Sequence, residues 1–226
     1  MMTAKQLPLA LSLPAAETFA TWVSGQNAEA LSMLRDSAHS LVYLWGPAGV
    51  GKSHLLHALC ADYQSLVYLP LTELVGVVDA QCLRGLESYQ WVCLDDLDAA
   101  LHEPSWCLEL FSLYNRIDDL AVGKLVVTAQ QSPSQLQVQL ADLKSRLQWG
   151  LTLQLQSLDD SQKVQAIQLR AKAMGLHLST DTAQFMVQRL PREMNHLVKA
   201  LQQLDQASIA AKRPLTIPFV KAVLGL

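Results

Sequence analysis

The sequence has no long hydrophobic run, no paired cysteine motif and no internal repeat. No apolar stretch approaches the roughly 18 residues that a membrane-spanning helix needs. The N-terminus is a poor signal peptide, because Lys5 is its only early charge and Pro8 and Pro14 interrupt a short apolar stretch. The cysteines at positions 60, 82, 93 and 107 form no CxxC pair and no zinc-type cluster with histidine. These absences argue against membrane, secreted and zinc-binding proteins and predict a cytoplasmic protein with reduced thiols.

Charged residues are also scarce, at 16%, whereas hydrophobic residues make up 50% of the 226 residues. Such a composition can fill a core and argues against intrinsic disorder. Residues 1–150 contain 8 Lys and Arg against 15 Asp and Glu, and residues 151–226 contain 9 against 5. The acidic residues 1–150 are unsuited to binding the phosphate backbone of a nucleic acid by themselves. The basic part suits an acidic ligand, with a solvated charged surface as the alternative.

Short apolar runs alternate with helical patterns up to residue 155. This alternation predicts a parallel sheet with helices on both faces. Strands are expected at 40–45, 66–69, 91–94, 124–129 and 151–155, and helices at 27–37, 51–63 and 105–120. Asn27 is a candidate cap for the first helix. The acidic stretch 72–90 is interpreted as a linker without an assigned role.

Beyond residue 155 only helical patterns remain, at 157–175, 180–190, 193–212 and 216–224. Thr216 and Pro218 suit the start of the last helix. We therefore expect three parts: a flexible arm at 1–15, an α/β domain at 16–156 and a small helical domain at 157–226.

Residues 46–53 read GPAGVGKS and match the P-loop pattern GxxxxGK[ST] in full, between a predicted strand and a predicted helix. Glycines let backbone N–H groups turn toward phosphate oxygens, and the start of the following helix adds positive potential. A Gly-rich turn without a ligand is the weak alternative. The sequence thus predicts that ATP or ADP binds with Mg²⁺, through Gly46, Pro47, Gly49, Val50, Gly51, Lys52, Ser53 and His54, with Ser53 on the metal.

Asp95 and Asp96 end the predicted strand that begins at Trp91. After a P-loop, a carboxylate in this place is what Mg²⁺ requires. We assign Asp95 to magnesium, through water, and Asp96 to orienting the attacking water, and we interpret Asp98 as a solvated loop acid. Thr128 ends the next strand, which would bring its hydroxyl to the sheet edge beside the phosphates. An ordinary buried threonine remains the alternative.

These segments together resemble the AAA+ family of P-loop ATPases, and within it the group formed by the bacterial initiator DnaA and its short relatives of the Hda family. The resemblance covers nearly the whole chain and implies an AAA+ parallel sheet followed by a helical lid. LKSRLQWG and LTIPFVK discriminate best, because no general property of P-loop proteins demands them. Besides the P-loop, the resemblance is carried by TF at 18–19 with Gly25 and Asn27, LDD at 94–96, LVVTA at 125–129, LKSRLQWG at 143–150, PREMNHL at 191–197 and LTIPFVKAVL at 215–224.

The resemblance implies roles for particular residues. Arg146 resembles the arginine finger, which stabilises charge on the γ-phosphate bound by a neighbouring subunit. Arg192 resembles the sensor-2 arginine, which reaches from the lid to the nucleotide of its own subunit, and Thr128 resembles sensor 1. Phe19 belongs to the segment that surrounds the adenine. For both arginines a solvated surface position is the alternative.

The chain has no segment resembling the DNA-reading domain of the initiator, so it resembles the Hda-type regulators. These regulators couple to the DNA-loaded sliding clamp, the beta subunit of DNA polymerase III, and make DnaA hydrolyse its ATP. The resemblance implies a negative regulator of replication initiation with DnaA and the clamp as partners and DNA contacted through the clamp. It leaves self-association open. Clamp binding would use the arm residues Gln6, Leu7, Leu9 and Leu11.

Two departures from the family pattern and two other functions qualify this hypothesis. Pro8 stands earlier than in the relatives, and a disordered or packed arm is the alternative to a clamp-binding one. The wider AAA+ pattern has Glu at the position of Asp96, and the shorter side chain predicts a weak ATPase with ADP as a structural ligand.

A helicase loader or DNA-dependent ATPase similar to DnaC would need a larger N-terminal domain than 1–15. A P-loop kinase would leave LKSRLQWG and the helical tail unexplained.

Overall fold

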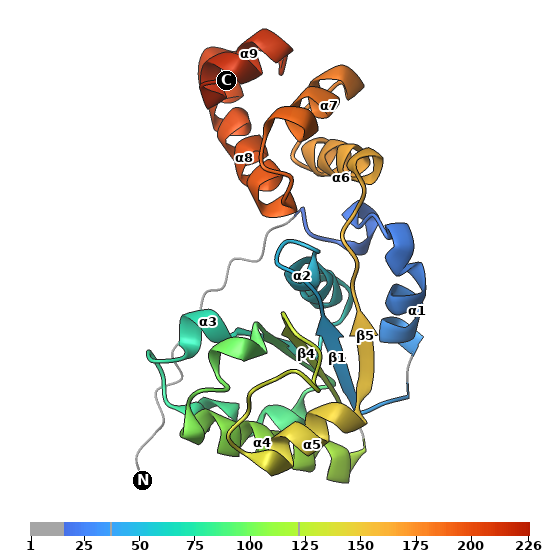
Figure 1. Cartoon of the computed structure of the whole chain (residues 1–226), viewed down its shortest axis with the longest axis vertical. Helices are drawn as coiled ribbons and strands as arrows, with labels where there is room; N and C mark the ends of the chain where they lie inside the picture. The colour runs from blue at the N-terminus through green and yellow to red at the C-terminus, as the bar shows by residue number, and fades with distance from the viewer. Residues whose placement is uncertain (1–15, 37, 122) are drawn as a thin grey trace.

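The computed structural model describes residues 16–36, 38–121 and 123–226. These residues form an α/β domain and a smaller helical domain, which lie end to end along the long axis of the molecule (Figure 1). Within these ranges no helix is long and apolar enough to cross a membrane.

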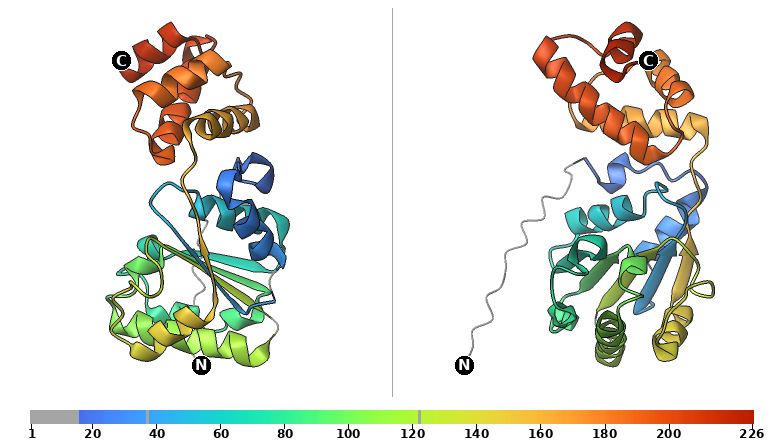
Figure 2. Two further views of the ribbon diagram at one scale, coloured as in Figure 1. Left: turned by 45° about the vertical axis from the view of Figure 1, so that its right-hand side comes forward. Right: turned by 60° about the vertical axis from the view of Figure 1, so that its left-hand side comes forward.

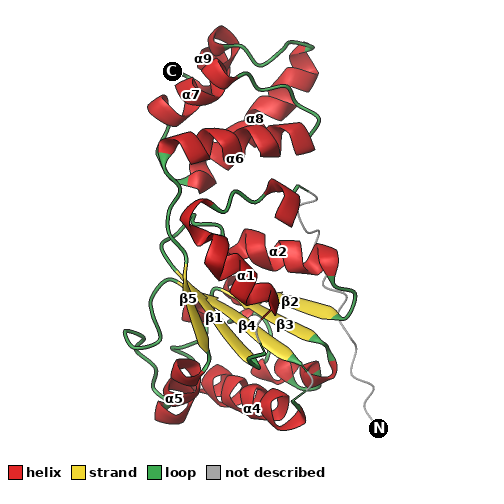
Figure 3. Cartoon of the chain, turned by 90° about the vertical axis from the view of Figure 1, so that its right-hand side faces the viewer, coloured by secondary structure: helices red, strands yellow, loops and turns green. Residues whose placement is uncertain are grey.

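Five parallel strands form one sheet in the order β2-β3-β4-β1-β5. The register pairs Leu44 of β1 with Thr128 of β4, and Leu94 of β3 with Val127, so these strands end at the same edge. That edge faces the helical domain (Figure 3). Every predicted strand is confirmed to within one residue at either end: β1 is Leu41–Trp45, β2 Leu66–Pro70, β3 Trp91–Asp95, β4 Lys124–Ala129 and β5 Leu151–Gln154.

Helices cover both faces of the sheet, as predicted. Helices α1 (Ala28–Asp36) and α2 (Lys52–Asp62) lie on one face, and α4 (Pro104–Leu120) and α5 (Ala141–Trp149) lie on the other (Figure 3). Successive residues of β1 therefore enter different cores: Val42 packs with the α2 side and Tyr43 with the α4 side. Burial of both faces explains why the strands are continuous apolar runs rather than alternating ones.

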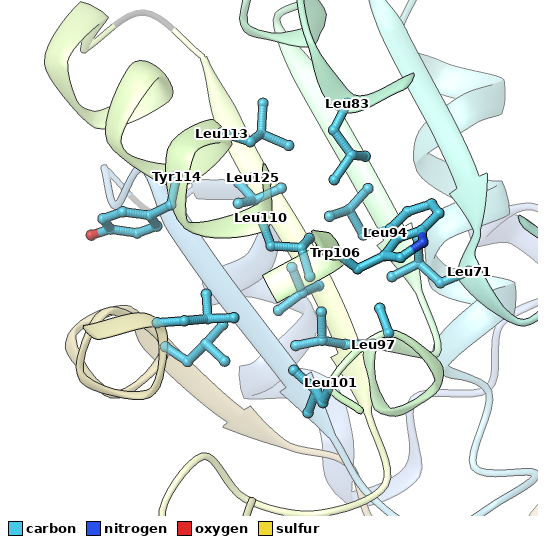
Figure 4. Packing of buried hydrophobic residues seen from close by; sticks show 14 of the residues in the cluster. Leu71, Leu83, Leu94, Leu97, Leu101, Trp106, Leu110, Leu113, Tyr114 and Leu125 are labelled. Atoms are coloured by element: carbon cyan, nitrogen blue, oxygen red, sulfur yellow. The ribbon is translucent and has the colours of Figure 1, made fainter. Parts of the chain in front are cut away.

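The α4 side has the largest apolar cluster (Figure 4). The predicted apolar face of α4 is confirmed, since Trp106, Leu110, Leu113, Tyr114 and Ile117 are all buried.

The acidic stretch 72–90 is a packed part of this cluster rather than a linker. It follows the start of α3 (Leu71–Leu74) and contains the 3-10 helices Ala80–Leu83 and Leu86–Ser88. Leu74 and Leu83 are buried in the cluster. Its charges also pair with α4: Glu87 accepts a hydrogen bond from Arg116 Nε at 2.9 Å. Its elements are short 3-10 helices, which leave no extended periodic pattern from which that packing could be predicted.

The helical domain, called the lid below, consists of α6 (Asp160–Ala173), α7 (Thr180–Arg189), α8 (Met194–Ala211) and α9 (Ile217–Leu224). Its four helices are set apart from the sheet (Figure 2). They have an apolar core of their own, separate from the two sheet cores. All four predicted helices are confirmed, but α6 begins three residues later than expected. The reason is a capping box, in which Asp159 accepts the N–H of Gln162 and the Gln162 side chain accepts the N–H of Asp159.

One helix was not predicted from the sequence, and the capping role predicted for Asn27 is wrong. Helix α5 was not predicted, because its buried apolar signal consists only of Leu143 and Leu147. Asn27 does not cap α1. Its side chain instead forms two hydrogen bonds with the peptide groups of Gln156, at 2.9 Å to the carbonyl oxygen and 2.7 Å from the N–H. Asn27 thereby fixes the start of the connection between β5 and the lid.

Candidate nucleotide-binding site

The P-loop, residues 46–53, connects β1 to α2 at the sheet edge that faces the lid (Figure 1). Gly49 and Gly51 have φ angles of 77° and 95°, which glycine adopts without the strain that a Cβ would cause. A Cβ at Gly51 would also lie 2.3 Å from the Trp22 ring. The loop leads directly into the N-terminus of α2, where free backbone N–H groups favour an anion.

Lys52 is folded into this loop. Its ammonium donates hydrogen bonds to the carbonyl oxygens of Gly46 and Pro47, at 2.8 and 3.1 Å, and the residue is 6% exposed. Burial lowers the pKa of Lys52, and the nearby acids Asp96 and Asp95 oppose that shift. The loop therefore holds one cation close to the acidic end of β3.

Asp95 at the end of β3 is held by two hydroxyl donors. Tyr68 donates to Oδ2 at 2.8 Å and Thr128 donates to Oδ1 at 2.5 Å. The carboxylate is 3% exposed. Each oxygen therefore already accepts one hydrogen bond from the protein, which fixes the orientation of the group and leaves its remaining lone pairs for other ligands.

Thr128 itself is fully buried, and its hydroxyl connects the two acids, because it also accepts the backbone N–H of Asp96 at 2.9 Å. Its observed contacts are with the β3 acids rather than with the P-loop. A sensor role for Thr128 stays a prediction.

Asp96 begins the turn after β3 with φ at 53°, an unusual backbone conformation for a residue other than glycine. Burial raises its pKa, and repulsion from Asp95 adds to the shift while Lys52 opposes it. Asp98 is half-buried in the 3-10 helix Leu97–Ala99, and its carboxylate accepts the backbone N–H of Gln130 at 2.9 Å. Bonding to the next strand end was not visible in the sequence because it depends on sheet order.

A cavity of about 280 Å³ lies between the P-loop and the lid. It is lined by the segment before α1, by the P-loop with the start of α2, by Asp96 and Gln130 after strands β3 and β4, and by the connection to the lid with helices α6 and α8. Of the predicted site residues, the cavity brings together Gly49, Val50, Gly51, Lys52, Ser53, His54 and Asp96.

The aromatic residue in the cavity wall is Trp22 rather than the predicted Phe19. Trp22 and Val23 line the cavity, whereas Phe19 packs outside it with Arg35, whose guanidinium carbon lies 4.7 Å from the ring centroid. The Trp22 indole N–H is buried and has no hydrogen-bond partner among the residues that the structure describes. The Trp22 and His54 rings also pack in a T-shaped arrangement, with 5.4 Å between their centroids. Only tertiary packing could decide which of two nearby aromatics faces the cavity.

Arg192, at the start of the lid segment that leads into α8, lies beside the P-loop. It lines a second hollow of about 310 Å³ that shares Ala48, Gly49, Leu158 and Met194 with the first. Arg192 is exposed and does not line the main cavity.

Arg146 is in α5, on the other face of the sheet, and does not line either hollow (Figure 3). Its guanidinium carbon lies 5.4 Å from the Tyr114 ring centroid and 5.5 Å from that of Trp149. Trp149 is 72% exposed. Two aromatic faces thus support a half-buried arginine at the surface.

Two further charged residues of the cavity wall had no sequence signal. Glu17 and Arg170 both line the cavity and form an ion pair with one another, although 153 positions separate them in the chain. No periodicity or motif could have paired them.

The remaining predicted residues lie elsewhere. Gln6, Leu7, Leu9 and Leu11 fall outside the described residues. No group of three or more His, Cys, Asp or Glu that could hold a metal ion occurs in residues 16–36, 38–121 and 123–226. Ser53 with Asp95 would therefore supply only part of the ligands of Mg²⁺, as expected for an ion that keeps several waters.

Residues 160–224 match the family model described as Hda, lid domain. The fold of the chain is similar to domain III of the Thermotoga maritima replication initiation protein DnaA, with a TM-score of 0.79 at 19% identity, over 94% of this chain and 97% of that one. Similarity extends to AMPPCP-bound DnaA from Aquifex aeolicus (TM-score 0.65, 18% identity, 84% of this chain and 66% of that one). The Thermotoga maritima RuvB branch migration motor gives a TM-score of 0.63 at 17% identity, over 87% and 67%. The parallel sheet and its lid thus form an AAA+ fold, as predicted.

Proposed function

Because the lid matches the Hda family and the chain has the fold of DnaA domain III, we propose that this protein is a DnaA-related negative regulator of replication initiation. In this proposal it binds ADP or ATP with Mg²⁺ at its own P-loop, binds the sliding clamp through its N-terminal arm and stimulates hydrolysis of the ATP held by DnaA. The lid match carries the proposal, since it is specific to one family rather than to P-loop proteins in general.

The charges and hydrogen-bond donors around the cavity support nucleotide binding. Lys52 and the N-terminus of α2 offer positive charge and N–H donors to phosphates. The unpartnered N–H of Trp22 is a buried donor in the cavity wall, which a polar atom of a base would satisfy. Arg192, beside Gly49, is the lid residue proposed to approach the phosphates from the second hollow.

Magnesium would be held by Ser53 and, through water, by Asp95. Tyr68 and Thr128 orient the Asp95 carboxylate, which suits a position that must present its free lone pairs in one direction. When bound, the ion neutralises phosphate charge. The adjacent Asp96 would orient the attacking water with a side chain shorter than glutamate. We therefore propose slow hydrolysis at this protein's own site and a mainly structural role for its nucleotide.

Arg146 is proposed to act in trans, on the nucleotide of DnaA. It is remote from its own cavity and lies at the surface, as a finger for a neighbouring subunit must. Tyr114 and Trp149 restrict the guanidinium before any partner arrives, so less entropy is lost when its planar fork meets phosphate oxygens.

Clamp binding is proposed on the sequence pattern of the arm alone, through Gln6, Leu7, Leu9 and Leu11. An extended peptide of this kind can place its amide in a polar site and its leucines in an apolar groove. DNA would then be contacted through the clamp.

The decisive experiment measures hydrolysis of DnaA-bound ATP with and without DNA-loaded clamp. Wild type should stimulate hydrolysis only when loaded clamp is present. Arg146→Ala should reduce stimulation by about 10³-fold while ADP binding by this protein stays unchanged, and Arg146→Lys should rescue poorly. Arg189→Ala, which removes an exposed lid arginine, is the matched control and should behave as wild type.

Normal stimulation by Arg146→Ala would refute the arginine-finger mechanism. DNA-dependent ATP hydrolysis by this protein in the absence of DnaA would instead favour a helicase-loader type of ATPase.

A further inference from the structure

The segment before α1, residues 16–27 and called the strap below, contacts the lid or the start of the connection to it at three points. The first is Asn27, whose amide is bonded in both directions to the peptide groups of Gln156, where the connection to the lid begins. Asn27 is 3% exposed, so this pairing is protected from water. The second is Gly25, which approaches α6 so closely that a Cβ would lie 2.8 Å from Gln162 Oε1.

The third point is a hydrogen-bonded triad centred on Glu17. Its Oε1 accepts a hydrogen bond from Arg170 Nη2 of α6 at 2.6 Å, and its Oε2 accepts one from His57 Nδ1 of α2 at 2.5 Å. The three side chains are only 10–13% exposed. One carboxylate therefore connects a lid helix to the helix that begins at the P-loop.

The pairing between Arg170 and Glu17 favours a positioning role for Arg170. Its Nη2 group is already paired with Glu17, whereas Arg192 is exposed. Burial alone would raise the pKa of Glu17, but the hydrogen bonds from His57 and Arg170 outweigh burial and hold that pKa at about 2. The carboxylate therefore stays ionised, and the pair stays intact, throughout the physiological pH range.

We propose that Glu17 is a positioning residue of the nucleotide site: it holds the lid over the cavity through Arg170 and is itself held against α2 by His57. The proposal rests on the proposed nucleotide site. Since the cavity is lined by both α2 and α6, a ligand there contacts both domains only when the lid is in place. The contacts of Glu17 with Arg170 and His57 are called the latch below. A weaker latch lowers the fraction of molecules with the lid in place, and the apparent affinity for the nucleotide falls by the same fraction.

The test compares Glu17→Gln, Arg170→Gln and the double variant for ADP affinity by calorimetry and for amide hydrogen exchange in α6. Each single variant should bind ADP about tenfold more weakly, within the usual range of coupling between sites. Amides of α6 should exchange faster in both, and the double variant should lose little more than either single one, because the two residues act as a pair.

Glu87→Gln is the matched control, since Glu87 pairs with Arg116 entirely within the α/β domain. It should leave both ADP affinity and exchange in α6 unchanged. Arg170→Lys keeps the charge with a poorer geometry and should fall between wild type and Arg170→Gln, which supplies a conservative variant that folds if the others do not.

The outcomes separate this proposal from the proposed function. If wild type fails to bind ADP, the nucleotide site is wrong, and unchanged exchange in α6 of the variants would then refute the latch as well. If wild type binds ADP and both single variants bind equally well, the latch is refuted while the nucleotide site stands. Weaker ADP binding without faster exchange in α6 would overturn the positioning role in favour of direct contact with the ligand.

Discussion

Lowering the pH should reduce the free energy of unfolding, and protonation of Glu17 should account for a defined part of that loss. The ordinary pKa of a glutamate, 4.5, applies to the unfolded chain, whereas the partners His57 and Arg170 outweigh burial and lower the folded-state pKa of Glu17 to about 2. Because the folded-state pKa is depressed, the ionised form favours folding. Its contribution is complete above about pH 5 and is lost as the pH falls from 4.5 toward 2.

The magnitude follows from these two values. The interval from 4.5 to about 2 corresponds to at most about 3 kcal/mol of unfolding free energy. At pH 3 the unfolded carboxyl is almost fully protonated and the folded one is mostly ionised, so about 2 kcal/mol should already be lost. Side-chain exposure of 13% for Glu17 and 10% for Arg170 means that solvent screens only a small part of this.

Urea unfolding of wild type and Glu17→Gln at pH 7, 5, 4 and 3 measures this contribution. The other carboxyl groups titrate in both proteins, so the difference between the two unfolding free energies isolates Glu17. We expect that difference to shrink by about 2 kcal/mol between pH 7 and pH 3. A difference that stays constant over this range would show that the triad does not stabilise the ionised carboxylate, and the reasoning would be wrong.

Three further predictions concern the cavity and the arm. Lys52→Ala should weaken ADP binding by about 10- to 100-fold, the size of a lost charged hydrogen bond, and equal affinities by calorimetry would refute the P-loop assignment. Gly51→Ala should lower the melting temperature and ADP affinity more than Gly85→Ala. Both glycines have positive φ, which costs a Cβ about 1–2 kcal/mol, but only at Gly51 does the Cβ also meet the Trp22 ring. Deletion of residues 1–11 should abolish clamp binding and leave the melting temperature nearly unchanged, and full clamp affinity of the shortened protein would contradict the proposed role of the arm.

The sequence by itself determined the order and type of the main elements. The apolar run before Gly46 and the helical spacing after Gly51 are local patterns, and their lengths alone distinguish strand from helix. The position of the acid pair at the end of β3 follows from strand direction, because all strands of a parallel sheet, including β3 and the P-loop strand β1, end at the same edge. Thr216 likewise marked the start of α9 through local capping preference. Such signals need no knowledge of distant residues.

Only the tertiary structure decided which side chains meet. Thr128 binds the β3 acids, Trp22 rather than Phe19 faces the cavity, and Asn27 holds Gln156 instead of capping a helix. The contact between Glu17 and Arg170 joins residues 153 positions apart. A sequence pattern specifies which face of an element is apolar, but the partner of a polar side chain depends on how the packed elements are rotated and on which groups are left unpaired once water is excluded.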